Sequence, residues 1–472
     1  MTTFIQNRPL AELRIGDTAS LTRTFTRDDV ETFALMSGDV NPSHVDADFA
    51  ASDRFHGIVA HGMWSAALIS TLLGTELPGP GTIYLGQDLQ FRKPVFLGDS
   101  VRVTVTVSAI DTNAEVPRAT LHCEVVNHHT EIVVEGKALV AVPTEKISRP
   151  RAHLPNLELR DPGAKLHALI TKAQKALTGR MPLRTAVVHA VDAVSLGGAV
   201  DAAQAGLITP VFVGPEARIR AAAEAAHIDL APYGLIATEH SHAAAAQAVA
   251  MARRGDVQAL MKGSLHTDEL MHAVVDAEIG LRTARRVSHV FVIDVVNWPT
   301  LQLLTDAAVN VVPDLEAKRD IVQNAIDLAH ALGMAQPKVA ILSAVETVTP
   351  KIPSTIDAAA LCKMADRGQI TGAVLDGPLA FDNAVSDAAA RTKGIVSPVA
   401  GHADILVAPD LEAGNMLAKQ LEYLAEAKVA GIVLGTRVPV VLTSRADLPD
   451  ARLASCALAV LQSMAAPVAK AG

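Results

Sequence analysis

A proline-rich segment between residues 142 and 163 most constrains how this chain can fold. Its sequence, VPTEKISRPRAHLPNLELRDPG, carries four prolines. Each proline removes a backbone donor and biases the preceding residue away from helix, so the segment is predicted to be extended. A chain of 472 residues exceeds one ordinary core. We therefore predict two domains, residues 1–142 and 165–472, joined by a linker over residues 143–164.

The first domain is predicted to be α+β, with one long helix wrapped by an antiparallel sheet. Residues 61–77, HGMWSAALISTLLGTEL, are apolar on nearly every side, which is typical of a buried helix. A shorter helix precedes it, with Thr26 as N-cap and Asp29 completing a capping box. Four strand-like segments follow the long helix, and a turn, NHHT, joins the last two: residues 82–91, 100–110, 119–127 and 131–142.

The second domain has a different pattern, in which short apolar strands alternate with Ala-rich helical stretches. Such alternation predicts an α/β fold with a mostly parallel, doubly wound sheet. We expect two lobes with a cleft between them. The eleven expected strands are TAVVHA, ITPVFVGP, GLIATE, QALMKGS, SHVFVIDV, LTDAAVNVVP, KVAILSA, ITGAVLDGP, ADILVAP, AGIVLG and PVVLT.

Charge and composition exclude several functional classes. The net charge is −9 without a block of like charges, which argues against nucleic acid as a partner. The three cysteines are scattered in apolar runs, so we expect neither disulfides nor a Cys-based metal site. No acidic metal cluster is evident, and no metal is predicted. No apolar run reaches membrane-spanning length and no secretory signal is visible, so a cytoplasmic protein without a membrane partner is expected.

The stretch SGDVNPSHVD, residues 37–46, combines turn-forming residues with possible catalytic groups. Asp, Asn, Pro and Ser favour turns, so the stretch alone is consistent with a polar loop. Its context is more specific, because HGMWSAALIS begins at residue 61 and LQFRKPVFLGDSVRV at residue 89. These three motifs, in this order, resemble the R-specific enoyl-CoA hydratases, the MaoC-like branch of the hotdog fold.

The resemblance implies a role for four residues. Asp39 and His44 would be the catalytic pair, Gly62 the oxyanion-hole residue, and Ser70 a further contributor to the site. Adding water to an enoyl thioester requires a base for the water, a proton for the α-carbon and stabilisation of the enolate. A glycine N–H at a helix start suits the enolate oxygen, because free amides and the helix dipole favour negative charge there. For His61 we expect a helix-start or packing role.

The second domain carries its own ordered series of motifs. These are ALMKGSLHTDEL, GLRTARRVSHVFVIDV, LLTDAAVNVVPDLEAKRDIVQNAIDLA, DGPLAFDNAVS, SPVAGHADILVAPDLEAGN and VPVVLTSRAD. Together they resemble the phosphate acetyl/butyryltransferase family over about residues 165 to 470. The resemblance implies a two-lobed α/β fold related to isocitrate dehydrogenase, and acyl transfer between coenzyme A and inorganic phosphate.

Such a reaction needs anion-binding groups and a stabilised oxyanion. Ser444 and Arg445 match the Ser-Arg pair that the family uses at the reacting carbonyl, and arginine suits phosphate because its fork donates two bonds. Lys262 and Ser264 follow a strand and would line the cleft. Arg282 and Arg286 are candidates for phosphate groups, although a solvated helix-end charge explains them equally well.

One position departs from the acetyl-specific pattern. An aspartate six residues beyond the arginine is expected to act on the thiol, but residue 451 is alanine. Asp450 stands directly before it and would take the role after a one-residue shift in a loop. Otherwise the sequence is closer to the butyryl-type branch, which shares TSRAD. The identity of the base and the acyl preference therefore stay open.

The sequence as a whole predicts a bifunctional enzyme with enoyl-CoA, acyl-CoA and inorganic phosphate as substrates. Coenzyme A is expected as substrate and product, with no tightly bound cofactor. A homo-oligomer through both domains is expected. The alternative is an acyltransferase whose hotdog domain is a non-catalytic assembly or CoA-binding module. A dehydrogenase is disfavoured, because no GxGxxG follows a strand.

Overall fold

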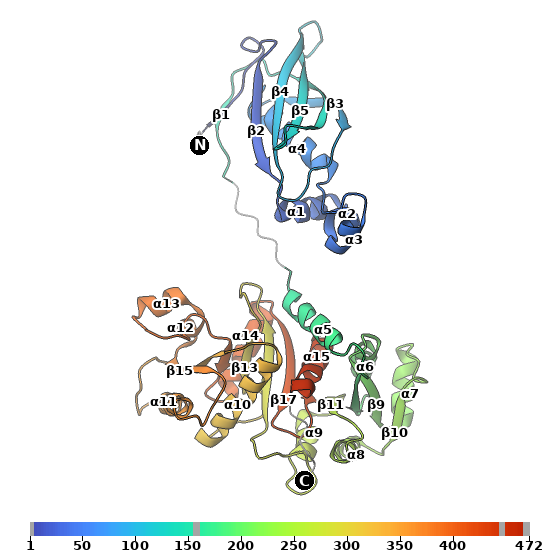
Figure 1. Cartoon of the computed structure of the whole chain (residues 1–472), viewed down its shortest axis with the longest axis vertical. Helices are drawn as coiled ribbons and strands as arrows, with labels where there is room; N and C mark the ends of the chain where they lie inside the picture. The colour runs from blue at the N-terminus through green and yellow to red at the C-terminus, as the bar shows by residue number, and fades with distance from the viewer. Residues whose placement is uncertain (1–3, 154–160, 443–448, 466–472) are drawn as a thin grey trace. The chain divides into compact units, whose positions relative to one another are not determined.

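The chain forms two compact units, residues 1–160 and 161–472. The structure is a computed structural model that describes residues 4–153, 161–442 and 449–465. Each unit has its own main sheet (Figure 1). Each unit also buries apolar side chains of its own. Within the described ranges, no helix combines the length and the apolar character needed to cross a membrane.

The first unit is an antiparallel sheet with the helix α4 (Gly62–Thr75) against it (Figure 1). The strands lie in the order β2-β4-β5-β6-β3. Their bounds are Thr18–Thr24 for β2, Ile83–Phe91 for β3, Ser100–Asp111 for β4, Arg118–Asn127 for β5 and Ile132–Ala141 for β6. Alternate residues of β4, such as Val103 and Val105, are fully buried and share a core with Ile69 and Leu72 of α4. This confirms the long helix and the four strands expected from the sequence, and adds β2.

Local side-chain bonds fix the other helices of this unit. The helices α1 (Arg27–Ser37), α2 (Pro42–Val45) and α3 (Ala47–Ser52) precede α4. The capping box at α1 is present, since the Thr26 hydroxyl accepts from the Asp29 N–H and the Asp29 carboxylate accepts from the Thr26 N–H. The expected turn between β5 and β6 is also present, with the Asn127 side chain accepting from the N–H groups of His129 and Glu131.

Part of the segment predicted as a linker packs on the first unit. The strand β7 (Ser148–Pro150) pairs antiparallel with β1 (Phe4–Gln6). The Asn7 side chain accepts from the Ile147 N–H and donates to the Glu145 carbonyl. These bonds keep residues 145–150, which belong to the extended linker predicted over residues 143–164, beside the start of the chain. Local proline chemistry alone does not reveal such a long-range pairing.

The second unit is built on one mixed, mostly parallel sheet of eleven strands in the order β10-β9-β8-β11-β18-β17-β12-β13-β16-β14-β15. The bounds are Leu183–Val188 (β8), Ile208–Gly214 (β9), Gly234–Ala237 (β10), Ala259–Lys262 (β11), Ser288–Asp294 (β12), Gln302–Thr305 (β13), Lys338–Leu342 (β14), Val374–Leu379 (β15), Ile405–Val407 (β16), Lys428–Leu434 (β17) and Val440–Val441 (β18). Three adjacent pairs, β12/β13, β12/β17 and β17/β18, are antiparallel.

Both faces of this sheet are buried. Consecutive residues of β8, Val187 and Val188, are fully buried and belong to different apolar clusters, which requires protein on each side. The helices that provide this cover are Ala164–Ala176 (α5), Ala193–Gln204 (α6), Glu216–Ala225 (α7), Ser241–Arg254 (α8), Thr267–Val274 (α9), Leu315–Ala331 (α10), Pro353–Asp366 (α11), Phe381–Val385 (α12), Asp387–Thr392 (α13), Leu411–Leu424 (α14) and Pro449–Ala465 (α15). The alternation of strands and helices is thus confirmed.

One expected strand is displaced. LTDAAVNVVP was predicted to be extended, but β13 ends at Thr305. The Asp306 side chain accepts from the N–H groups of Ala308 and Val309, which folds the chain into a turn. The apolar residues of this stretch favour a strand, and the aspartate beside them prevents one.

The capping box gives a local stability prediction. Replacing Thr26 by Ala removes one hydrogen-bond acceptor at the start of α1 and should destabilise that helix by about 1 kcal/mol. Amide hydrogens of α1 should then exchange about fivefold faster by mass spectrometry, since local opening follows local stability. Thr22→Ala, at an exposed position of β2, is the matched control and should leave α1 protected. Equal exchange in the two variants would contradict the role of the cap.

Candidate functional site

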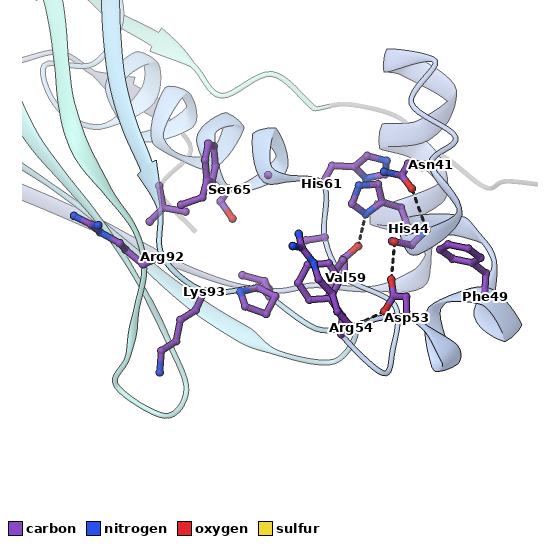
Figure 2. Close-up of a pocket in the computed structure, with 18 residues that line it drawn as sticks. Asn41, His44, Phe49, Asp53, Arg54, Val59, His61, Ser65, Arg92 and Lys93 are labelled. Atoms are coloured by element: carbon purple, nitrogen blue, oxygen red, sulfur yellow. Dashed lines mark hydrogen bonds between the residues drawn. The ribbon is translucent and has the colours of Figure 1, made fainter.

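The first unit contains a cavity of about 760 Å³ between the start of α4, the end of β3 and the loop before α4. His44, His61, Gly62 and Ser65 line it together with Phe91 (Figure 2). Asp39 lies beside it, because ligand atoms of Asp39, His44 and His61 all fall within 4.8 Å of one another. The cavity therefore collects Asp39, His44 and Gly62, three of the four residues singled out from the sequence of this unit.

The loop that carries Asp39 and His44 is built by its own turn residues. Gly38 ends α1 in the left-handed conformation, with φ of 76°. The Asn41 side chain then accepts from the Ser43 N–H and caps α2, whose first residue is Pro42. The short helix α2 turns His44 toward the cavity. The turn chemistry visible in the sequence is thus the means by which the catalytic candidates are placed.

Two backbone carbonyls fix the histidine rings. The Nδ1 atom of His44 lies 2.8 Å from the carbonyl oxygen of Val59, and Nε2 of His61 lies 2.9 Å from the carbonyl oxygen of Asp39. A carbonyl oxygen only accepts, so Nδ1 of His44 and Nε2 of His61 carry protons. The remaining nitrogen of each neutral ring presents a lone pair. The two ring centroids are 4.0 Å apart, and Figure 2 shows the rings side by side.

His61 lies at a helix start and in a packed position, as expected from the sequence, and it also makes a long-range hydrogen bond. Its side chain is 2% exposed and contributes no cap to α4, although it occupies the N-cap position. Instead, its ring packs against Phe33 and holds the backbone of Asp39. The sequence shows that His61 directly precedes Gly62 at a helix start. It does not show the long-range hydrogen bond between His61 and the Asp39 carbonyl.

Gly62 begins α4, so its N–H has no acceptor within the helix. A Cβ atom at this position would lie 3.1 Å from the Phe91 ring, which is closer than nearly all such contacts. The glycine therefore allows β3 and α4 to approach each other at the cavity. Ser65, one helical turn further on, is buried and lines the same cavity.

Ser70 does not lie with these residues. It is exposed, on the face of α4 that also carries Met63, and it is not among the residues that line the cavity. Helical periodicity explains the difference: Ser70 lies seven residues after Met63 and so shares its face, whereas Ser65 shares the face of Gly62. Ser43 and Ser65 line the cavity, whereas Ser70 does not.

Three cations lie around the cavity, from two parts of the unit (Figure 2). Arg54 extends from the loop before α4, with its guanidinium 4.5 Å from the centre of the Phe55 ring. Arg92 and Lys93 directly follow β3 and pair with Glu135 and Glu131. All three are exposed, so they remain available to an anionic ligand.

In the second unit, Ser264 and Lys262 stand at the end of β11, beside the end of β8. The Ser264 hydroxyl donates to the Asp192 carboxylate at 2.6 Å and lies 3.0 Å from the Ser195 hydroxyl. Burial alone would raise the pKa of Asp192. Hydrogen bonds from Ser195 and Ser264, together with the charge of Arg452, hold that pKa below its usual value. Lys262 is 5% exposed. The structure thus gives Ser264 a place in a hydroxyl–carboxylate network joining two strand ends.

The two candidate arginines are bound to different partners. Arg286 donates from Nε to the Asn310 side chain at 2.8 Å, and its backbone N–H donates to Asp320. Arg282 donates from its guanidinium to the Val275 carbonyl. Both side chains are exposed, and these contacts hold them on the segment before β12.

Ser444 and Arg445 lie outside the described residues. Asp450 is described and lies in the first turn of α15, not in a loop as the sequence suggested. Its side chain is 71% exposed, with an oxygen 4.0 Å from Nε2 of His167. Asp450 and Ala451 line a second cavity of about 450 Å³ together with His167 and Lys428. Helical geometry turns the side chains of residues 450 and 451 about 100° apart, so Asp450 does not simply replace an aspartate at position 451.

Comparison with known proteins assigns both units. The family described as Phosphate acetyl/butaryl transferase matches residues 235–460, and the family described as MaoC like domain matches residues 14–131. The phosphate acetyltransferase of Rhizobium meliloti is 64% identical over 286 residues, which cover 61% of this chain and 90% of that protein. The chain belongs to the phosphate acetyl/butyryltransferase family. In this acyltransferase, a MaoC-like dehydratase domain is fused before the family domain.

Two solved structures are also similar. A branched-chain phosphotransacylase from Enterococcus faecalis is 30% identical and covers 60% of this chain and 99% of its own, with a TM-score of 0.53. The R-hydratase PhaJ1 from Pseudomonas aeruginosa is 43% identical and covers 33% of this chain and 99% of its own, with a TM-score of 0.32. The two family matches agree with the two resemblances seen in the sequence.

The Asp192 network in the acyltransferase domain gives a pH-dependent prediction. Asp192→Ala removes the cap of α6 and the acceptor of Ser264, which should cost about 1–2 kcal/mol and lower the melting temperature by about 2–4 °C. Folding lowers the pKa of Asp192, so ionised Asp192 stabilises the folded state. This contribution is fully present above the pKa of the unfolded chain, about 3.9, and is lost as the pH falls through the pKa of the folded state.

The difference in melting temperature between wild type and Asp192→Ala should therefore be constant near neutral pH and shrink below about pH 4. Differential scanning calorimetry measures it. Asp201→Ala, at an exposed position of α6, is the control and should show a small shift at every pH. A difference that grows on acidification would overturn the assignment.

Proposed function

We propose that this chain catalyses two reactions on coenzyme A thioesters. The second domain transfers a short acyl group between coenzyme A and inorganic phosphate. The observation that carries this proposal is the 64% identity to a phosphate acetyltransferase over 286 residues. The first domain hydrates an enoyl-CoA, on the support of its family match and of the cavity at His44. Coenzyme A is a substrate or product of both reactions.

The proton arrangement of the cavity supports the proposed hydration. His44 donates from Nδ1 to Val59, so its Nε2 lone pair accepts from a water molecule that also donates to Asp39. The water oxygen adds to the β-carbon as one of its O–H bonds breaks, and the C=C electrons move onto the thioester oxygen. A proton from the Asp39–His44 pair then reaches the α-carbon, so that no proton is consumed overall.

The thioester oxygen requires a donor as the enolate forms. The Gly62 N–H at the start of α4 is such a donor, and the N-terminal end of the helix dipole adds to it. The Phe91 ring forms an apolar part of the cavity wall beside it. Arg54, Arg92 and Lys93 at the cavity opening suit the phosphate groups of coenzyme A. These groups orient the thioester with its reacting carbons inside.

The hydratase proposal is tested at Asp39. Asp39→Asn keeps the size of the side chain but removes its basic oxygen, so hydration of crotonyl-CoA should fall at least about a hundredfold. Loss of the enoyl absorbance measures the rate. Asp48→Asn, an exposed carboxylate on α3, should retain activity. Absence of hydration in wild type with any enoyl-CoA would favour an assembly or CoA-binding module.

The acyltransferase proposal is tested by phosphate-dependent thiol release from acetyl-, propionyl- and butyryl-CoA, followed with a thiol-reactive dye. Arg445→Ala should lower the rate at least about a hundredfold, because removing one oxyanion donor has that effect. Arg220→Ala, an exposed arginine paired with Glu216 on α7, should leave the rate unchanged. Equal rates in all three proteins would contradict the role of Arg445. The preferred thioester would settle the acyl preference left open by Ala451.

We infer that the second domain has the two-lobed architecture of the isocitrate-dehydrogenase-like folds. The strand directions support this inference. The strands β17 and β12 pair antiparallel with each other and with their outer neighbours, and they separate one parallel block, β10-β9-β8-β11-β18, from another, β13-β16-β14-β15. Each block has helices of its own, so each can form one lobe.

We also propose a homo-oligomer. The strand β3 is an edge of its sheet and exposes Ile83, Tyr84 and Leu85 at 60%, 39% and 47%. An unpaired apolar edge is covered in natural proteins, commonly by another strand. Light scattering should therefore give a mass of at least twice 49.4 kDa. A mass of one protomer would contradict the proposal. If β3 forms an interface, Leu85→Lys should lower the mass measured by light scattering.

A further inference from the structure

We propose that Asp39, His44 and His61 form a binding site for a divalent transition metal ion, with Zn²⁺ as the probe, and that the bound ion blocks hydration. Among the residues that the structure describes, these three bring one carboxylate oxygen and two ring nitrogens within 4.8 Å of one another. Two imidazoles and a carboxylate are a ligand set found in zinc enzymes. The sequence did not predict this site, since the three residues are spread over positions 39 to 61.

The hydrogen bonds of the two histidines favour metal binding. A histidine that binds a metal commonly donates from its other nitrogen to a carbonyl or carboxylate, which fixes the tautomer and makes the ligand more basic. His44 does this through Nδ1 to Val59, and His61 does it through Nε2 to the Asp39 carbonyl. The lone pairs on Nε2 of His44 and Nδ1 of His61 are therefore available before an ion binds.

His61 provides the second observation that points to a ligand. Its side chain is 2% exposed, and its Nδ1 atom is buried without a hydrogen-bond partner. A buried polar nitrogen without a partner is costly, so a group that accepted its lone pair would stabilise the site. In hydration as proposed here, Nδ1 of His61 has no task. A metal ion would engage it.

The remaining geometry is adjustable at one position. Zinc holds nitrogen and oxygen ligands at about 2.0–2.2 Å, so tetrahedral ligand atoms lie roughly 3.4 Å apart. The present spacing must therefore contract. Asp39 can provide this movement, because it is exposed and one of its carboxylate oxygens only accepts a long bond of 3.3 Å from the Asn41 N–H. The fourth position on the ion would be left to water.

A bound ion would occupy the same lone pairs that the reacting water needs. It should therefore compete with enoyl-CoA hydration and leave the acyltransferase site untouched. The inhibition rests on the proposed hydration, whereas the binding itself does not. Direct binding measurements separate the two.

The test uses the full chain, freed of metal with a chelator, and titrated with Zn²⁺ against a chromogenic chelator. Wild type should bind one equivalent of Zn²⁺. The affinity for Zn²⁺ should fall at least about tenfold in His61→Gln and in His44→Gln, since even outer partners of metal ligands contribute that much. With Co²⁺, wild type should show visible absorption bands of a nitrogen- and oxygen-bound ion, and both variants should lose them. If His61→Gln does not fold, His44→Gln and the surface change Asp39→Asn still test the site.

The matched control is His128→Gln with His129→Gln, an exposed pair whose rings are 3.8 Å apart on the β5–β6 turn. This control should keep the tight equivalent. Loss of that equivalent in the control, or equal binding in wild type and the site variants, would overturn the proposal. Inhibition of crotonyl-CoA hydration by Zn²⁺ should weaken in parallel with binding. Binding without any hydration in metal-free wild type would refute the proposed function and leave the metal site standing.

Discussion

Two hydrogen bonds from histidine rings to backbone carbonyls determine the chemistry of the first unit. The bond from His44 to Val59 ties α2 to the segment before α4, and the bond from His61 to Asp39 ties the start of α4 to the loop after α1. Together they hold three separate pieces of chain around one cavity. They also decide which nitrogen of each ring has a lone pair. The proposed base and the proposed metal ligands both depend on this arrangement.

The two domains place polar groups beside a buried sheet in different ways. In the first unit, a short turn sequence between helices carries the catalytic candidates, and α4 supplies a free N–H. In the second, polar residues follow the ends of parallel strands. The network of Asp192 and Ser264 joins two of these ends. Each solution keeps the polar groups on short segments between helices or strands.

The sequence predicts well what neighbouring residues decide. The capping box at Thr26, the turn at Asn127 and the burial of α4 depend on residues within a few positions, and all three are confirmed. It predicts poorly what distant residues decide. The pairing of β7 with β1 and the bond from His61 to Asp39 join segments that local preferences cannot relate. Ser70, expected at the site from the family resemblance, lies on the exposed face of α4, and a family position by itself does not show which helix face a residue occupies.

The tautomers of His44 and His61 decide whether the cavity can work as proposed, and they can be measured. Nitrogen-15 spectra of the labelled chain at neutral pH distinguish a protonated Nδ1 from a protonated Nε2, and His44→Gln and His61→Gln assign the signals. The account predicts that His44 carries its proton on Nδ1 and His61 on Nε2. A proton on Nε2 of His44 would remove the lone pair that faces the water, and would contradict both the hydration mechanism and the metal site.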